Sequence, residues 1–177
     1  MDKKLRRWEW IGAGICFLLS ILLHFLFDYI GREPLLVGFF VPVNESVWEH
    51  LKLLFYPGIL LGIIKYFIVG KNYANYFPAK IIGIFIGMFG IVVSFYTYTG
   101  IVGENFLIPD ILTYVFGAIV MAITTIKITQ SGKWQNWKNL LVIALIVMGV
   151  LFAIWTYNPP SLGIFQDYEA VFFLNMF

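Results

Sequence analysis

Residues 11–30 read IGAGICFLLSILLHFLFDYI, an apolar run that indicates the class of the whole chain. A helix needs about 20 mainly apolar residues to cross the roughly 30 Å hydrocarbon core of a bilayer, and this run supplies them. The basic segment before it, residues 3–7, raises the alternative of a secretory signal peptide. The apolar part of a signal peptide is shorter, about 7–15 residues, and it ends at a small-residue cleavage site that we do not find here. We therefore expect the run to form a transmembrane helix that stays in the protein.

The composition extends this assignment to the rest of the chain. Apolar residues make up 60% of the 177 residues and charged residues only 12%, whereas soluble domains are about half apolar and a quarter charged. The sequence predicts an all-α polytopic integral membrane protein, a five-transmembrane-helix bundle in a single membrane domain. The predicted spans lie at about 11–30, 47–69, 79–98, 109–126 and 140–157.

Small residues and prolines predict where the helices pack and begin. Gly58 with Gly62, and Gly83 with Gly87, have the GxxxG spacing that lets two helix backbones approach closely in a membrane. A proline fits the first turn of a helix, where its missing N–H group has no partner to lose. Pro78 and Pro109 therefore mark the starts of the third and fourth predicted spans.

The distribution of charge predicts the orientation of the bundle. Across five spans, most basic residues fall on one side, namely Lys3, Lys4, Arg6, Arg7, Lys65, Lys71, Lys80, Lys127, Lys133 and Lys138. Because basic residues concentrate on the cytoplasmic side, we expect the N-terminus inside and the C-terminus outside, in the cytoplasmic membrane. The segments 31–46 and 158–177 then lie at the outer face, in the interface or folded over the outer mouth. The net charge of only +2 gives no indication of a nucleic-acid partner.

The segment 44–52, NESVWEHLK, opens the second predicted span with a high density of polar groups. Ionisable residues inside a span are costly and often mark binding or transport sites. At about 100° per residue, Glu45, Glu49 and Lys52 fall on one stripe of the helix, whereas His50 faces a different neighbour. A structural alternative stays open, because Ser46 and Glu49 have the spacing of a capping box, with Lys52 neutralising the glutamates.

Polar side chains recur on other predicted spans at the same outer level. Ser20, His24 and Asp28 are spaced by four residues and share one face of the first span, and Asp110 begins the fourth. Imidazole and carboxylate groups are ligands for a divalent metal ion such as zinc, although the sequence contains neither HExxH nor CxxC. The predicted binding residues are Glu45, Glu49, His50, Lys52, His24, Asp28 and Asp110, and the predicted metal ligands are His24, His50, Glu49 and Asp28.

The NESVWEHLK stretch, continued by Leu53, Phe55 and Pro57, resembles the signature of an uncharacterised family of small bacterial multi-pass membrane proteins, a domain of unknown function. The resemblance runs the full length of the chain and includes the NPP step at residues 158–160 and the acidic Asp167, although the tail after Asp167 departs from the family pattern. It implies a bacterial, multi-span protein and draws attention to the motif. It implies no particular activity.

Three classes of function are open on this basis. The first is binding or translocation of a small polar solute or cation through the outer-facing cluster, with Glu45, Glu49, His50 and Lys52 as binding groups. The second is a membrane-embedded, metal-dependent hydrolase or transferase acting on a lipid-linked substrate, in which the metal activates water. The third is a structural or interaction subunit of a membrane complex, in which the cluster only pins helices together. The lipid bilayer is a partner in all three, and the sequence does not define the oligomeric state.

Overall fold

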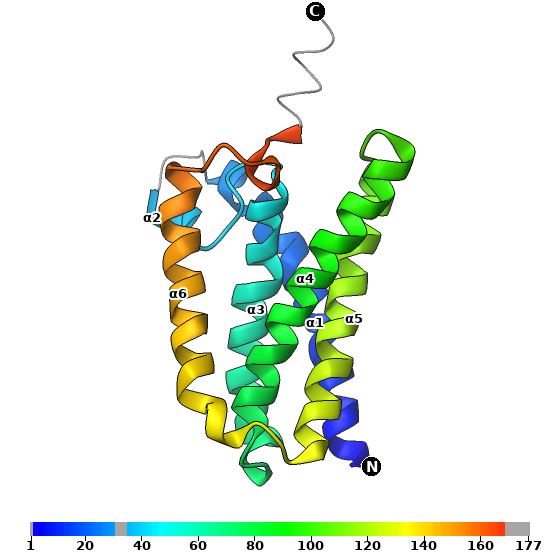
Figure 1. Cartoon of the computed structure of the whole chain (residues 1–177), viewed down its shortest axis with the longest axis vertical. Helices are drawn as coiled ribbons and strands as arrows, with labels where there is room; N and C mark the ends of the chain where they lie inside the picture. The colour runs from blue at the N-terminus through cyan, green and yellow to red at the C-terminus, as the bar shows by residue number, and fades with distance from the viewer. Residues whose placement is uncertain (1, 31–34, 169–177) are drawn as a thin grey trace, which may run out of the picture.

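The computed structural model describes residues 2–30 and 35–168 and forms a bundle of long helices (Figure 1). Within these residues, five helices are long and apolar enough to cross a membrane. They are α1 (Lys3–Tyr29), α3 (Val47–Ile68), α4 (Tyr76–Val102), α5 (Leu107–Ser131) and α6 (Lys138–Tyr157). A short helix, α2 (Leu35–Gly38), and the 3₁₀ turns η1 (Gly70–Asn72), η2 (Gln135–Trp137) and η3 (Gly163–Phe165) complete the order. The predicted all-helical class with five apolar helices is confirmed, and the described residues contain no strand.

The first helix begins well before the predicted span. Its first turn is capped by Asp2, whose carboxylate accepts hydrogen bonds from the backbone N–H groups of Lys4 and Leu5 at 2.7 and 3.1 Å. The Tyr73 hydroxyl also donates to Asp2, and this hydrogen bond lowers the pKa of the Asp2 carboxyl. Because hydropathy marks only the apolar part of a helix, a capped polar turn is not visible as part of a span.

Successive long helices run in opposite directions, so the bundle has two distinct ends. One end, which we call the N-terminal end, holds the start of α1 together with η1 and η2 (Figure 1). The other, which we call the α2 end, holds α2, the start of α3, the α4–α5 turn and η3 (Figure 1). α1 packs against α3 and α5, and α3 also packs against α4. α6 is peripheral, since within it only Phe152 and Thr156 are buried.

Glycine lets α4 and α5 lie side by side. A Cβ atom on Gly87 would lie 2.8 Å from the Gly117 carbonyl oxygen, and one on Gly83 would lie 2.9 Å from the Met121 carbonyl oxygen. These distances are too short for any side chain, so the two backbones meet directly. The predicted packing role of this glycine pair is confirmed.

The central helix of the bundle is α3, whose span is the most buried of the five. Its predicted packing pair, Gly58 and Gly62, faces α4, where added Cβ atoms would meet Ile84 at 3.1 Å and Lys80 at 2.9 Å. Pro57 lies inside the helix and is buried. α3 thus contacts each of the other four long helices.

Candidate functional site

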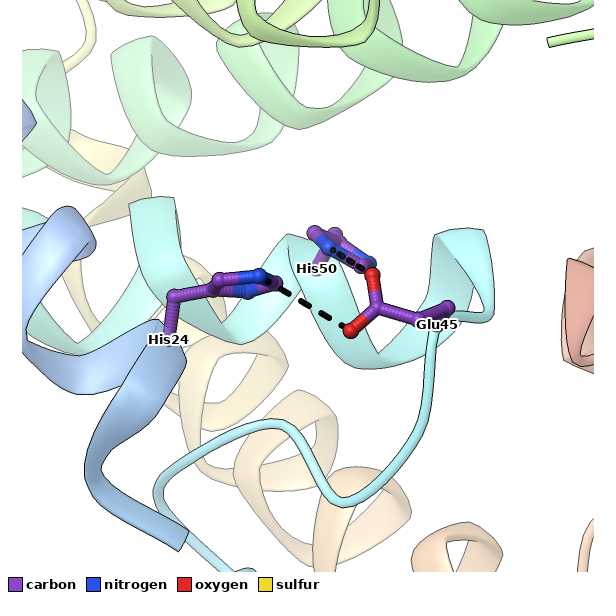
Figure 2. Close-up of side chains that lie close together, drawn as sticks. All are labelled: His24, Glu45 and His50. Carbon is purple, nitrogen blue, oxygen red and sulfur yellow. Dashed lines mark ion pairs between the residues drawn. The ribbon is translucent and has the colours of Figure 1, made fainter. Parts of the chain in front are cut away.

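Two histidines and one glutamate converge at the α2 end. His24 comes from α1 and His50 from α3, and both imidazoles point toward the carboxylate of Glu45, in the connection before α3 (Figure 2). The His50 Nε2 atom lies 3.2 Å from Glu45 Oε2, and the His24 Nε2 atom lies 3.7 Å from Glu45 Oε1. One ligand atom from each residue lies within 4.8 Å of the other two. We call these three residues the His–Glu–His cluster.

A hydrogen bond to the backbone determines which ring nitrogen of His50 carries the hydrogen. His50 Nδ1 lies 2.9 Å from the backbone carbonyl oxygen of Ser46. A carbonyl oxygen can only accept, so Nδ1 carries a hydrogen and donates it. In the neutral imidazole, Nε2 is then an acceptor that faces the carboxylate, another acceptor, at 3.2 Å. Two acceptors at this distance need a cation between them, either a proton or a metal ion.

The start of α3 explains why Glu45 joins the histidines. Ser46 is the N-cap, and its hydroxyl accepts a hydrogen bond from the Glu49 N–H group at 3.3 Å. The Ser46 N–H group donates to the Asn44 side chain at 3.0 Å, which closes a turn before the helix. Glu45 therefore lies outside the helix. The predicted stripe of Glu45, Glu49 and Lys52 is wrong for Glu45, because the helical period applies only from Val47 onward.

Glu49 and Lys52 form a separate buried pair. Lys52 Nζ has four acceptors within hydrogen-bond distance, namely Glu49 Oε2 at 2.6 Å, the carbonyl oxygens of Gly38 and Val41 at 2.8 and 3.3 Å, and Thr156 Oγ1 at 2.6 Å. The lysine side chain is 0% exposed, and an ammonium has only three hydrogens, so these acceptors satisfy it completely. The predicted neutralisation of a glutamate by Lys52 is confirmed for Glu49.

The second half of the predicted capping box is replaced by another contact. The Glu49 carboxylate accepts a hydrogen bond from the Val43 N–H group at 3.0 Å rather than from the N-cap residue, and it accepts one from Thr156 at 3.0 Å. Glu49 and Lys52 thus join α3 to α6 and to the segment that follows α2. Their side chains turn away from the His–Glu–His cluster, and neither lines the pocket beside it.

A pocket of about 550 Å³ opens beside the cluster, between α1, α3, α4 and α5. Asp110, a predicted binding residue, lines the same pocket, together with the three residues of the cluster. It accepts hydrogen bonds from the Tyr98 hydroxyl and, at 3.1 Å, from the Asn105 amide. The structure thus brings His24, His50, Glu45 and Asp110 to one pocket.

One predicted ligand cannot be placed. The backbone of Asp28 belongs to α1, but its side chain is outside the part of the protein that the structure describes. Ser20, on the same predicted face, lines the pocket, and its hydroxyl donates to the Phe17 carbonyl oxygen at 2.7 Å.

Sequence reasoning missed a buried charge cluster at the N-terminal end. Glu9 of α1 accepts hydrogen bonds from Lys65 of α3 at 2.5 Å, from Lys80 of α4 at 3.4 Å and from the Tyr76 hydroxyl at 3.0 Å. All four side chains are buried. The sequence assigned both lysines to the basic side of the membrane, whereas they turn inward. The signal that could have found the cluster is Glu9 itself, an acidic residue within a basic segment.

The His–Glu–His cluster combines two imidazoles and a carboxylate, ligand types that divalent transition metals accept. Zinc binds nitrogen and oxygen at about 2.0–2.2 Å in tetrahedral geometry, which puts ligand atoms about 3.3 Å apart. The distances of 3.2 and 3.7 Å from His50 and His24 end on different oxygens of Glu45, and one ligand atom from each of the three residues lies within 4.8 Å of the others. Binding of an ion would therefore bring the three side chains closer together. The side chains of His24, His50 and Glu45 are 26%, 31% and 36% exposed, so an ion has access to them. The hydrogen bond from His50 Nδ1 to a carbonyl is the usual outer contact that orients a metal-binding imidazole.

Comparison with known proteins identifies the family. The sequence matches a protein family described as "Family of unknown function (DUF6512)" over residues 1–171, so the chain belongs to that family. The predicted membership of a family without an assigned activity is confirmed. No curated protein and no solved structure matches the chain.

Proposed function

We propose that this member of a family of unknown function is a multi-pass protein of the bacterial cytoplasmic membrane that binds a divalent metal ion, zinc foremost, at His24, Glu45 and His50. The observation that carries the proposal is the convergence of two imidazoles and a carboxylate, from three separate segments, within 4.8 Å at the mouth of a pocket. Two histidines and one glutamate are a ligand set of catalytic zinc sites, which leave a fourth position open.

Charge supports an outward-facing site. The N-terminal end carries Lys3, Lys4, Arg6 and Arg7, and basic residues at span ends face the cytoplasm. With the N-terminus inside and the C-terminus outside, the α2 end and its cluster meet the external medium. A metal ion then reaches the ligands without crossing the bilayer.

The experiment is a zinc titration of the purified protein in detergent after treatment with a chelator. Isothermal titration calorimetry should find one zinc ion per chain. His24→Ala, Glu45→Gln and His50→Ala should each weaken zinc binding by about 100-fold or more, because loss of even an outer contact to a ligand costs 10- to 100-fold. Glu104→Gln is the matched control, since this carboxylate is exposed in the α4–α5 turn at the same end of the bundle.

Two results would contradict zinc binding at this site. One is a wild-type protein that takes up no zinc, which would reduce the cluster to an imidazolium–carboxylate ion pair between α1 and α3. The other is zinc uptake that the three ligand variants leave unchanged, which would place the ion elsewhere.

A metal-dependent hydrolase or transferase is a second candidate, and the position of Asp110 favours it. Asp110 lines the same pocket as the cluster but is not one of its three ligands. A bound zinc ion lowers the pKa of its water to about 7, and a nearby carboxylate can accept the proton. Hydrolysis of a long-chain p-nitrophenyl ester in mixed micelles should then require zinc. Asp110→Asn should slow it while leaving the zinc content unchanged, and zinc-independent hydrolysis would contradict the mechanism.

A further inference from the structure

The pocket beside the cluster has a polar mouth and an apolar floor. His24, Glu45, His50 and Asp110 line it at the α2 end. Phe17, Leu53, Ile91 and Tyr114 line it deeper in the bundle, about two helical turns along α1 from His24, or roughly 10 Å. The Tyr114 hydroxyl faces the backbone, where its one hydrogen is shared between the carbonyl oxygens of Leu53 at 3.2 Å and Cys16 at 3.3 Å. The floor therefore offers aromatic and aliphatic carbon to an occupant.

The side of the pocket is continuous with the surface that faces lipid. Ile21 and Phe25 of α1 line the pocket and are also 42% and 61% exposed. Ile111 and Leu107 of α5 do the same and are 42% and 75% exposed. Apolar residues exposed on a transmembrane helix contact acyl chains. The pocket therefore opens between the α2-end halves of α1 and α5, toward the hydrocarbon of the outer-facing leaflet.

We propose that this pocket takes the apolar chain of a membrane amphiphile, which enters sideways between α1 and α5 and presents its polar head to His24, Glu45 and His50. The inference rests on the proposed function for the head, because an oxygen of the head group would occupy the open position of the metal. Binding of the apolar chain of the amphiphile depends on the pocket alone.

The dimensions and the chemistry agree with such an occupant. A cavity of about 550 Å³ lies within the 300–1,000 Å³ range of small-molecule sites, with the few convergent polar groups that orient a ligand. A water-soluble polar solute would make no favourable contact with the apolar floor. An amphiphile already in the bilayer matches both parts, since its head lies at the level of His24 and its chain at the level of Phe17.

The test uses dodecanohydroxamic acid with a photoactivatable diazirine at the end of its chain. The full chain is reconstituted into phosphatidylcholine nanodiscs, with zinc or after chelation, and labelled positions are mapped by mass spectrometry. We expect zinc-dependent labelling of α1 near Phe17 and of α4 near Ile91. Labelling confined to lipid-facing positions far from the pocket, such as Val147 of α6, in both zinc states would overturn the proposal.

Paired variants test the side entrance. Ile111→Trp narrows it, whereas Leu112→Trp adds the same bulk at the next residue of α5, which is 59% exposed and does not line the pocket. The first variant should reduce pocket labelling by about tenfold, the effect of excluding roughly two methylene groups. The second should leave it unchanged. Equal labelling in both variants would contradict entry between α1 and α5.

A second pair of variants, on α1, shows whether reduced labelling comes from a narrowed entrance or from a folding defect in α5. Ile21→Trp should reduce pocket labelling as Ile111→Trp does, and Leu22→Trp, at a position 69% exposed and outside the pocket, should not. Zinc content is measured on every sample. Pocket labelling that persists without zinc would support the amphiphile and contradict contact of its head with the metal. Zinc uptake without pocket labelling would support the proposed function and contradict the amphiphile.

Discussion

Glu49 and Lys52 lie close to His50 in the chain, yet they face a different part of the molecule. Their contacts reach Thr156 of α6, the end of α2 and the segment after it, whereas His50 faces α1. The difference follows from helix geometry, since successive residues point about 100° apart. One short motif thus has two roles: Glu49 and Lys52 hold the α2 end together, and His50 belongs to the His–Glu–His cluster.

Loss of one member of the buried pair should be more damaging than loss of both. Lys52→Met leaves the Glu49 carboxylate buried without its cation, and breaking such a pair costs about 3–5 kcal/mol. Thermal unfolding in detergent should show this loss. The double variant Lys52→Met/Glu49→Gln should recover part of it, because no charge then stays buried alone.

Lys127→Met is the control for the single variant. Lys127 is exposed on α5 near the N-terminal end, where its ammonium can extend to the interface. Its replacement should leave the unfolding temperature close to that of the wild type. If Lys52→Met were tolerated equally well, the pair would not stabilise the fold.

Pairs of helices in this bundle meet through two kinds of contact. α4 and α5 approach at glycines, where van der Waals contact replaces the hydrophobic effect that is missing between helices in lipid. α1, α3 and α4 are joined at the N-terminal end by Glu9, which two lysines share. Since a charge in an apolar interior needs a partner, this cluster specifies the rotation of three helices about their axes.

Gly87→Ala should test the α4–α5 contact. The new methyl group would lie 2.8 Å from the Gly117 carbonyl oxygen, a backbone atom that cannot move aside alone. We expect a loss of about 1–3 kcal/mol in the free energy of unfolding, measured by thermal or denaturant unfolding in detergent.

Gly100→Ala is the matched control on the same helix, because a Cβ atom there meets nothing within 4 Å. Alanine favours a helix over glycine by up to about 1 kcal/mol, so this variant should be neutral or slightly stabilising. A Gly87→Ala protein as stable as Gly100→Ala would mean that α4 and α5 can separate without cost.

For the whole molecule, the odd number of apolar helices among the described residues places the start of α1 and the end of α6 at opposite ends of the bundle (Figure 1). The site at the α2 end is therefore on the side away from the N-terminus. Which side of the membrane this is depends on the basic residues near the N-terminal end, which favour the cytoplasm for that end.

Reporter fusions should test the orientation. An alkaline phosphatase domain fused after Phe177 should be active, because it folds only outside the cytoplasm. The same domain inserted within residues 131–136, between α5 and α6, should be inactive, and a green fluorescent protein domain should give the opposite results at the two positions. The reverse pattern would place the His–Glu–His cluster inside and contradict the proposed access from the external medium.

Local features of the sequence were sufficient to predict the class, the five apolar helices and several contacts. Hydropathy adds up along a continuous segment, so a spanning run is visible without knowledge of its neighbours. The N-cap at Ser46 and the salt bridge from Glu49 to Lys52 join residues within one turn of each other. Each glycine pair is likewise visible in the sequence as a four-residue spacing within one helix. The cap at Asp2 was missed because hydropathy does not register polar turns.

Only the tertiary structure decided which residues share a site. Glu45 meets His24 of another helix, Glu49 meets Thr156 at a separation of 107 residues, and Glu9 meets Lys65 at a separation of 56. The sequence placed Glu45 and Glu49 together on the stripe of Lys52, whereas in the structure only Glu49 pairs with Lys52 and Glu45 lies beside the two histidines. Such pairings depend on the rotation of each helix about its axis and on the residue at which it begins. Both are determined by packing among all the helices, and no single segment contains that information.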